Sequence, residues 1–148
     1  MLSKKSQYSI YALVKLAKER AKGPILIRDI AESEKIPKKF LEAILLDLRN
    51  LGLIGSKKGK GGGYYLIKDP SQINLATIIR KFDGALAFIS CASKNYYEEC
   101  KHCKDEKTCG VKNVFDEIRV ETDRMLRNTT ISDIINREEK LKKRYGSS

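Results

Sequence analysis

The sequence lacks the features of a membrane protein, a secreted protein or a typical enzyme. No stretch of its 148 residues is long and apolar enough to span a bilayer. The first twenty residues do not resemble a secretory signal, because Lys15 and Lys18 interrupt the apolar run and no small-residue cleavage site follows. A single histidine, His102, and no visible nucleophile–base pairing argue against a catalytic pocket. We therefore expect a cytoplasmic protein that is not an enzyme and does not bind membranes.

The glycine-rich segment 59–63 also lacks the spacing of nucleotide-binding loops. In a P-loop the lysine precedes Ser or Thr, whereas Lys60 precedes a glycine. In a dinucleotide-binding loop the last glycine would stand where Tyr64 stands. Both kinds of phosphate-binding loop are therefore excluded.

Positive charge is abundant and unevenly distributed. The formal net charge is +11. Residues 1–63 hold 14 Lys/Arg against 6 Asp/Glu, a net charge of +8, and residues 64–148 hold 16 against 13, a net charge of +3. The basic N-terminal half indicates a polyanionic partner, although a solvated basic surface has the same composition.

Apolar spacing predicts three helices followed by a hairpin. Helices are expected over 6–22, over 27–32 and from Pro37 to Gly52. The third helix carries an apolar stripe of Leu41, Ile44, Leu45 and Leu48. Two strand-like runs, 53–56 and 64–67, flank a loop rich in lysine and glycine. Three helices and a two-stranded wing define the winged helix-turn-helix, whose third helix enters the DNA major groove.

The rest of the chain predicts a fourth helix, a loop and a long fifth helix. The fourth helix begins after Asn74, a good N-cap, and ends at Gly84. The long helix starts at Val111, and its apolar stripe is Val114, Phe115, Ile118, Met125 and Leu126. Thr130 with Asp133 resembles the capping box of a last short helix, and the charged residues that follow are expected to be irregular.

The expected fold is mainly α with a small β-hairpin wing, a winged helix-turn-helix plus a long C-terminal dimerisation helix. The expected parts are a DNA-binding domain (1–84), a cysteine-rich sensor loop (85–110), the dimerisation helix with a short terminal helix (111–136) and a charged tail (137–148).

Two sets of residues are candidates for contacts with DNA. The exposed face of the third helix offers Lys38, Lys39 and Glu42, which can bond guanine edges, phosphates or a cytosine amine, or can simply be solvated. The wing favours the DNA interpretation, because its glycines allow close backbone approach and its lysines suit phosphates or a minor groove. The wing candidates are Lys57, Lys58, Lys60, Gly61 and Gly62.

These motifs make the sequence similar to the Rrf2 family, the IscR, NsrR and CymR type of regulator. The resemblance extends to about Asn136. It rests on Ser6-Gln7-Tyr8, Phe40-Leu41-Glu42, Leu51-Gly52-Leu53-Ile54, Asp83-Gly84, Asn128-Thr129-Thr130-Ile131 and, most of all, the wing segment Lys58-Gly59-Lys60-Gly61-Gly62-Gly63-Tyr64.

The resemblance implies a homodimeric DNA-binding transcriptional regulator, most simply a repressor, on a partly palindromic double-stranded operator. It implies further DNA contacts at Ser6 and Tyr8 and base discrimination by Glu42. The family's usual wing arginine, which enters the minor groove, is replaced by Lys58.

All four cysteines lie in one loop, with the spacing Cys91-x8-Cys100-x2-Cys103-x5-Cys109. In a reducing compartment such a cluster indicates metal ligands or redox thiols rather than disulfides. Thiolates favour iron–sulfur clusters and zinc, and thiols that sense oxidants without metal, or merely structural cysteines, are alternatives.

Cluster-binding members of the family use three cysteines here, and their final x5 gap matches Cys103 and Cys109. Their histidine ligand falls at Lys112, so Cys100 completes the set or a ligand comes from elsewhere. We expect a cluster, most simply 2Fe-2S, with nearby Lys101, Lys104 and Lys107 helping to keep the thiols deprotonated. The alternative function is an iron–sulfur or zinc electron carrier or scaffold without sequence-specific DNA binding.

Overall fold

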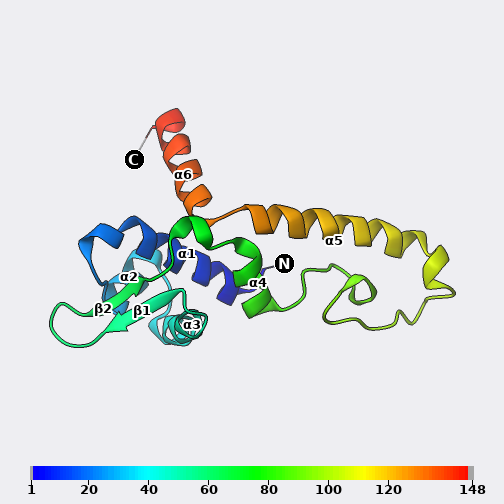
Figure 1. The fold of residues 1–148 in the computed structure, drawn as a ribbon, viewed down its shortest axis with the longest axis horizontal. Helices are drawn as coiled ribbons and strands as arrows, with labels where there is room; N and C mark the ends of the chain where they lie inside the picture. The colour runs from blue at the N-terminus through cyan, green and yellow to red at the C-terminus, as the bar shows by residue number, and fades with distance from the viewer. Residues whose placement is uncertain (1, 147–148) are drawn as a thin grey trace.

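The structure, a computed structural model, describes residues 2–146 (Figure 1). It confirms the predicted mainly α fold with a two-stranded wing. The helices and strands are α1 (Lys4–Lys18), α2 (Ile27–Glu34), α3 (Lys38–Asn50), β1 (Ile54–Lys57), β2 (Gly63–Leu66), α4 (Leu75–Asp83), α5 (Gly110–Asn128) and α6 (Ile131–Tyr145). Short 3₁₀ turns are η1 (Arg20–Lys22), η2 (Pro70–Gln72), η3 (Ser90–Ala92) and η4 (Glu106–Thr108).

The core of the N-terminal unit forms around the apolar stripe of α3. Its predicted members Leu41, Ile44, Leu45 and Leu48 are all fully buried. They pack with Leu13 and Leu16 of α1 and with Ile30 of α2, which follow the same helical spacing. Residues on the opposite side of α3 are consequently turned to solvent.

The wing is an antiparallel pair in which Ile54 opposes Leu66 and Lys57 opposes Gly63. It is fastened to the segment before α2 by two backbone hydrogen bonds. Ile25 N donates to Tyr64 O at 2.8 Å, and Tyr64 N donates to Ile25 O at 2.7 Å. The hairpin therefore has a fixed base from which its loop projects.

The start of α4 and the junction between α5 and α6 are bound together. Asn74 caps α4, as predicted, because its side chain accepts from Thr77 N at 3.0 Å. Thr130 and Asp133 form the predicted capping box at the start of α6. Ile131 N donates to Ile73 O at 2.9 Å, and Ile131 is fully buried in the core of the N-terminal unit.

The prediction of a short last helix followed by an irregular charged tail is wrong. Helix α6 continues to Tyr145; it packs against α1, and its C-terminal end projects away from the body of the molecule (Figure 1). The many charged residues of this segment are compatible with a helix, because Glu138 pairs with Lys142 at 3.1 Å and with Lys18 of α1. Lys142, Lys143 and Arg144 also complement the negative end of the helix. Within residues 2–146, no helix combines the length and the apolarity needed to cross a membrane.

A polar contact joins the start of α1 to the end of α4. Asp83 accepts from Ser6 Oγ at 2.9 Å and from Ser3 N at 3.2 Å. Burial raises the pKa of Asp83, but the hydrogen bonds from Ser3 and Ser6 outweigh it, and the pKa lies below the ordinary value of 3.8. The ionised carboxylate therefore stabilises the folded state above that pH.

We predict that Ser6→Ala lowers the free energy of unfolding by about 1–2 kcal/mol, because the partly buried carboxylate of Asp83 loses a donor. Urea unfolding at pH 7 measures this, and Ser33→Ala, on the surface of α2, is the control. The Asp83 contribution is complete well above pH 3.8 and is lost as the pH falls through the lower folded-state pKa. A Ser6→Ala deficit that is equally large at every pH contradicts the contact.

Candidate DNA interface and cysteine loop

The exposed face of α3 begins at the N-terminus of the helix. Lys38, Lys39 and Glu42 are exposed, whereas Leu41 between them is fully buried. The backbone N–H groups of this first turn add partial positive charge in the same place. The structure thus places the three predicted side chains together on a surface that attracts anions and carries one acceptor.

The two residues predicted on α1 differ in accessibility. The prediction that Ser6 contacts DNA is contradicted for its side chain, which is fully buried because the hydroxyl is directed to Asp83. Tyr8 is half-buried, and its ring packs edge-on against Phe40 of α3, with centroids 6.0 Å apart. Tyr8 therefore supports α3 from α1, and only part of its side chain is accessible.

The loop of the wing is basic and open to solvent. Lys57, Lys58 and Lys60 are all exposed, and Gly61 has a φ of 73° with no atom near its missing side chain. The base of the wing also contacts α3, because Arg49 Nη1 donates to Ser56 Oγ at 3.0 Å. Sequence reasoning missed Arg49, since spacing alone does not indicate that the end of α3 meets β1.

Two glycines of the wing are required by contacts within the chain. A Cβ on Gly62 would lie 2.2 Å from Lys57 O. A Cβ on Gly63, whose φ is 138°, would lie 2.4 Å from Ile25 O. Gly62 is buried, so its predicted contact with DNA is limited, and both glycines serve to close the loop and seat it on the body of the domain.

The cysteines lie on the long connection between α4 and α5. This connection runs alongside α5 (Figure 1). Cys91, in η3, is buried, and Cys100, Cys103 and Cys109 are partly exposed. Cys109 caps α5, because its Sγ accepts from Lys112 N at 3.4 Å. A negatively charged sulfur is favoured at that end of a helix.

The electrostatic surroundings of Cys103 differ from those predicted. Burial raises the pKa of the Cys103 thiol, and the charges of Cys109, Glu106, Cys100 and Cys91 raise it further. The neighbouring lysines were predicted to lower the pKa of the thiols. For Cys103 the charges that act are instead those of Glu106 and the other cysteines, which raise it. The charges of the other three sulfurs therefore influence the Cys103 thiol.

Two polar pairs lie near the cysteines, Tyr97 with Glu106 and Lys112 with Asp116. Glu106 accepts from the hydroxyl of Tyr97, and this hydrogen bond raises the pKa of Tyr97 to about 12. Lys112, at the family's histidine position, bonds Asp116 at 2.7 Å, which raises its pKa and keeps its amine charged. Lys112 therefore cannot act as a ligand in this arrangement. His102 is exposed.

The cysteine sulfurs do not form a closed metal site in this conformation. Among the residues described, no group of three His, Cys, Asp or Glu side chains converges closely enough to hold a metal ion. The type of donor fits a soft metal centre.

No residue of helix α5 is fully buried within its own chain. The predicted apolar stripe divides into two faces. Phe115 and Leu126 are half-buried toward the cysteine loop and α4, whereas Val114, Ile118 and Met125 are exposed. Val111 extends the exposed row, which follows spacings of three, four and seven residues.

Comparisons with known proteins match nearly the whole chain. Residues 2–137 match the family described as Rrf2, iron-dependent transcriptional regulator. An rrf2-like HTH-type transcriptional regulator of Rhodobacter capsulatus is 40% identical over 121 residues, which is 80% of this chain and 81% of that protein.

Two solved structures share the fold. The chain is similar to CymR, the global cysteine regulator of B. subtilis, with a TM-score of 0.74, 27% identity and coverage of 90% of this chain and 95% of that one. It is equally similar to T. potens IscR, with a TM-score of 0.74, 26% identity and coverage of 95% and 90%.

Proposed function

The chain belongs to the Rrf2 family of transcriptional regulators, and from this premise we propose that it is a homodimeric repressor whose DNA binding is switched at the cysteine loop. Its named relatives are regulators, a non-enzymatic class. The observation that carries the proposal is the pairing of an exposed basic wing with an exposed polar face at the start of α3.

The two surfaces have different tasks in DNA recognition. The wing lysines neutralise phosphates or enter the minor groove, which supplies affinity for any sequence. Glu42, on the helix expected in the major groove, accepts from a cytosine amine and so contributes to base choice. Lys58 is a point charge where the family has arginine, and it cannot form a bidentate contact.

The exposed row on α5 supports a dimer formed by this helix. Val111, Val114, Ile118 and Met125 are between 38% and 63% exposed in the single chain, an unusual density of apolar surface. A second copy of α5 would cover it and would present two winged domains to half-sites about one helical turn apart. This fits a partly palindromic operator.

We place the switch at Cys91, Cys100, Cys103 and Cys109. These thiols would hold an iron–sulfur cluster, most simply 2Fe-2S, which supplies redox and ligand-exchange chemistry when bound. The family description as iron-dependent favours iron over zinc. Cys109 is the N-cap of α5, so closure of the loop around a bound metal centre would act on the first turn of the dimer helix and alter how the winged domains are spaced.

We predict that Lys58→Ala weakens binding to specific and random DNA alike, because a phosphate contact is lost. Because the proposed dimer carries Lys58 twice, the slope of log affinity against log salt becomes shallower by about 2. Titration of labelled duplexes at several salt concentrations measures both effects, and Lys140→Ala on α6 is the control. An unchanged slope rules out a phosphate contact at Lys58.

We predict that Glu42→Ala, unlike Lys58→Ala, lowers sequence preference without weakening binding to random DNA. Preference at one base-pair position falls by about 1–3 kcal/mol, while binding to random DNA is maintained or strengthened as a negative charge is removed. Competition among operator variants, each changed at one position, measures the loss. Equal weakening on every sequence shows that Glu42 does not read a base.

We predict that Ile118→Lys produces a monomer at micromolar concentration, because a charge enters the centre of the exposed row. Val120→Lys is the matched control, since Val120 is 54% exposed but lies on another face of α5. Sedimentation velocity distinguishes the two. If the unmodified chain is itself monomeric, the dimer proposal fails.

We predict that alanine at Cys91, Cys100, Cys103 or Cys109 lowers the cluster content after anaerobic reconstitution. Iron, sulfide and zinc analysis with an absorption spectrum measures it, and His102→Ala is the control. DNA affinity is then compared with and without the bound metal centre. If all four variants retain full iron and sulfide, the proposed ligand set is wrong. If the affinity for DNA is the same with and without the metal centre, the proposed switch is wrong.

A further inference from the structure

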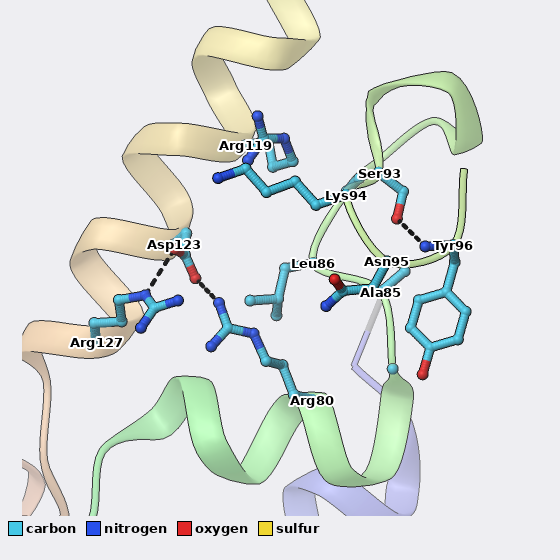
Figure 2. Close-up of a pocket in the computed structure, with 12 residues that line it drawn as sticks. Arg80, Ala85, Leu86, Ser93, Lys94, Asn95, Tyr96, Arg119, Asp123 and Arg127 are labelled. Carbon is cyan, nitrogen blue, oxygen red and sulfur yellow. Dashed lines mark hydrogen bonds and ion pairs between the residues drawn. The ribbon is translucent and has the colours of Figure 1, made fainter. Parts of the chain in front are cut away.

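A basic pocket lies where the end of α4, the beginning of the cysteine-containing connection and the middle of α5 meet (Figure 2). Its volume is about 240 Å³. The side chains that give it its chemistry are Arg80, Lys94, Asn95, Arg119, Asp123 and Arg127. Neither the cysteines nor the predicted DNA contacts line it, so the proposed function leaves this pocket without a role.

The pocket carries more positive charge than it neutralises. Four of its side chains are cationic, and Asp123 is its one carboxylate. Asp123 already serves two of them, since it accepts from Arg80 Nη2 and, at 2.8 Å, from Arg127 Nε (Figure 2). Burial raises the pKa of Asp123, but the hydrogen bond from Arg127 and the charges of Arg80 and Lys94 lower it overall.

Arg119 is the side chain whose hydrogen bonding is incomplete. Its Nε is buried and has no hydrogen-bond partner among the described residues. The side chain is only 14% exposed, and its nearest carboxylate, Asp116, lies 3.9 Å away. Exposed Lys94 has no ion-pair partner within residues 2–146, and Figure 2 shows it beside Arg119. Buried donors of this kind normally have a partner.

We propose that this pocket binds a small oxyanion of the carboxylate or phosphate class. Guanidinium groups match the geometry of such anions and bind them through paired hydrogen bonds. A bound anion would give the Arg119 guanidinium a hydrogen-bonding partner and offset the excess charge of Arg119 and Lys94 while leaving the Asp123 pairs intact.

The walls of the pocket limit the size of the ligand. Its volume is below the roughly 300–1,000 Å³ of pockets for drug-sized molecules. At Gly84 a Cβ would come within 3.2 Å of the Tyr96 ring, so the glycine lets that ring close one side. A compact anion therefore fits better than a nucleotide or a peptide.

The position of the pocket gives the anion a mechanical role. Arg80 belongs to α4, which packs on the winged unit, whereas Arg119 and Arg127 belong to α5. An anion held by all three would tie α4 to α5 through charge. This inference goes beyond the proposed function, because it depends neither on metal binding nor on DNA.

Calorimetric titration of the intact protein with inorganic phosphate and with citrate, in separate experiments at constant ionic strength and without DNA, tests the inference. We expect one saturable site per chain for at least one of these anions, and which one binds identifies the class. Arg119→Gln should weaken that binding by about tenfold or more. Arg124→Gln, also on α5 but paired with Glu121 outside the pocket, should change it less than about twofold.

Two results would overturn the inference. One is no saturable binding of either anion up to about 10 mM. The other is an equal effect of Arg119→Gln and Arg124→Gln, which indicates non-specific attraction to a basic protein. Lys94→Gln provides a second test should Arg119→Gln fail to fold, because Lys94 is exposed on a loop. Unchanged binding by Lys94→Gln in that case also rejects the site.

Discussion

Burial of the apolar stripe of α3 is the constraint on which the rest of the N-terminal unit depends. Leu41, Ile44, Leu45 and Leu48 fill the centre of the core, and a helix can turn only one face inward. The polar residues at its start are therefore held outward by the packing behind them. The surface proposed to face DNA is thus fixed in position by the buried side chains behind it.

The wing shows a similar division between support and contact. Its lysines are free in solvent, while Gly62 and Gly63 are required because backbone oxygens of Lys57 and Ile25 lie where side chains would be. A glycine run that suggests close approach to a ligand is thus partly explained by close approach within the chain. The same seat on Ile25 gives the lysines a defined position relative to α3.

The sequence was sufficient for features set by local chemistry and insufficient for those set by distant contacts. Helical spacing, the Asn74 cap and the Thr130–Asp133 capping box predicted the elements because each depends on residues a few positions apart. Burial of Ser6 could not be predicted, since its partner Asp83 is 77 residues away. The length of α6 was missed because its charges are satisfied by Lys18 as well as by its own neighbours.

The exposed surface of helix α5 makes the order of this helix depend on the concentration of the protein. No residue of α5 is fully buried in its own chain, so the helix gains only part of the packing on which helical stability depends. If a second copy supplies that packing, mass action links the order of α5 to the protein's own concentration. Dilution then makes α5, which Cys109 caps, less ordered. The concentration of the regulator therefore sets how firmly the cysteine loop is anchored to this helix.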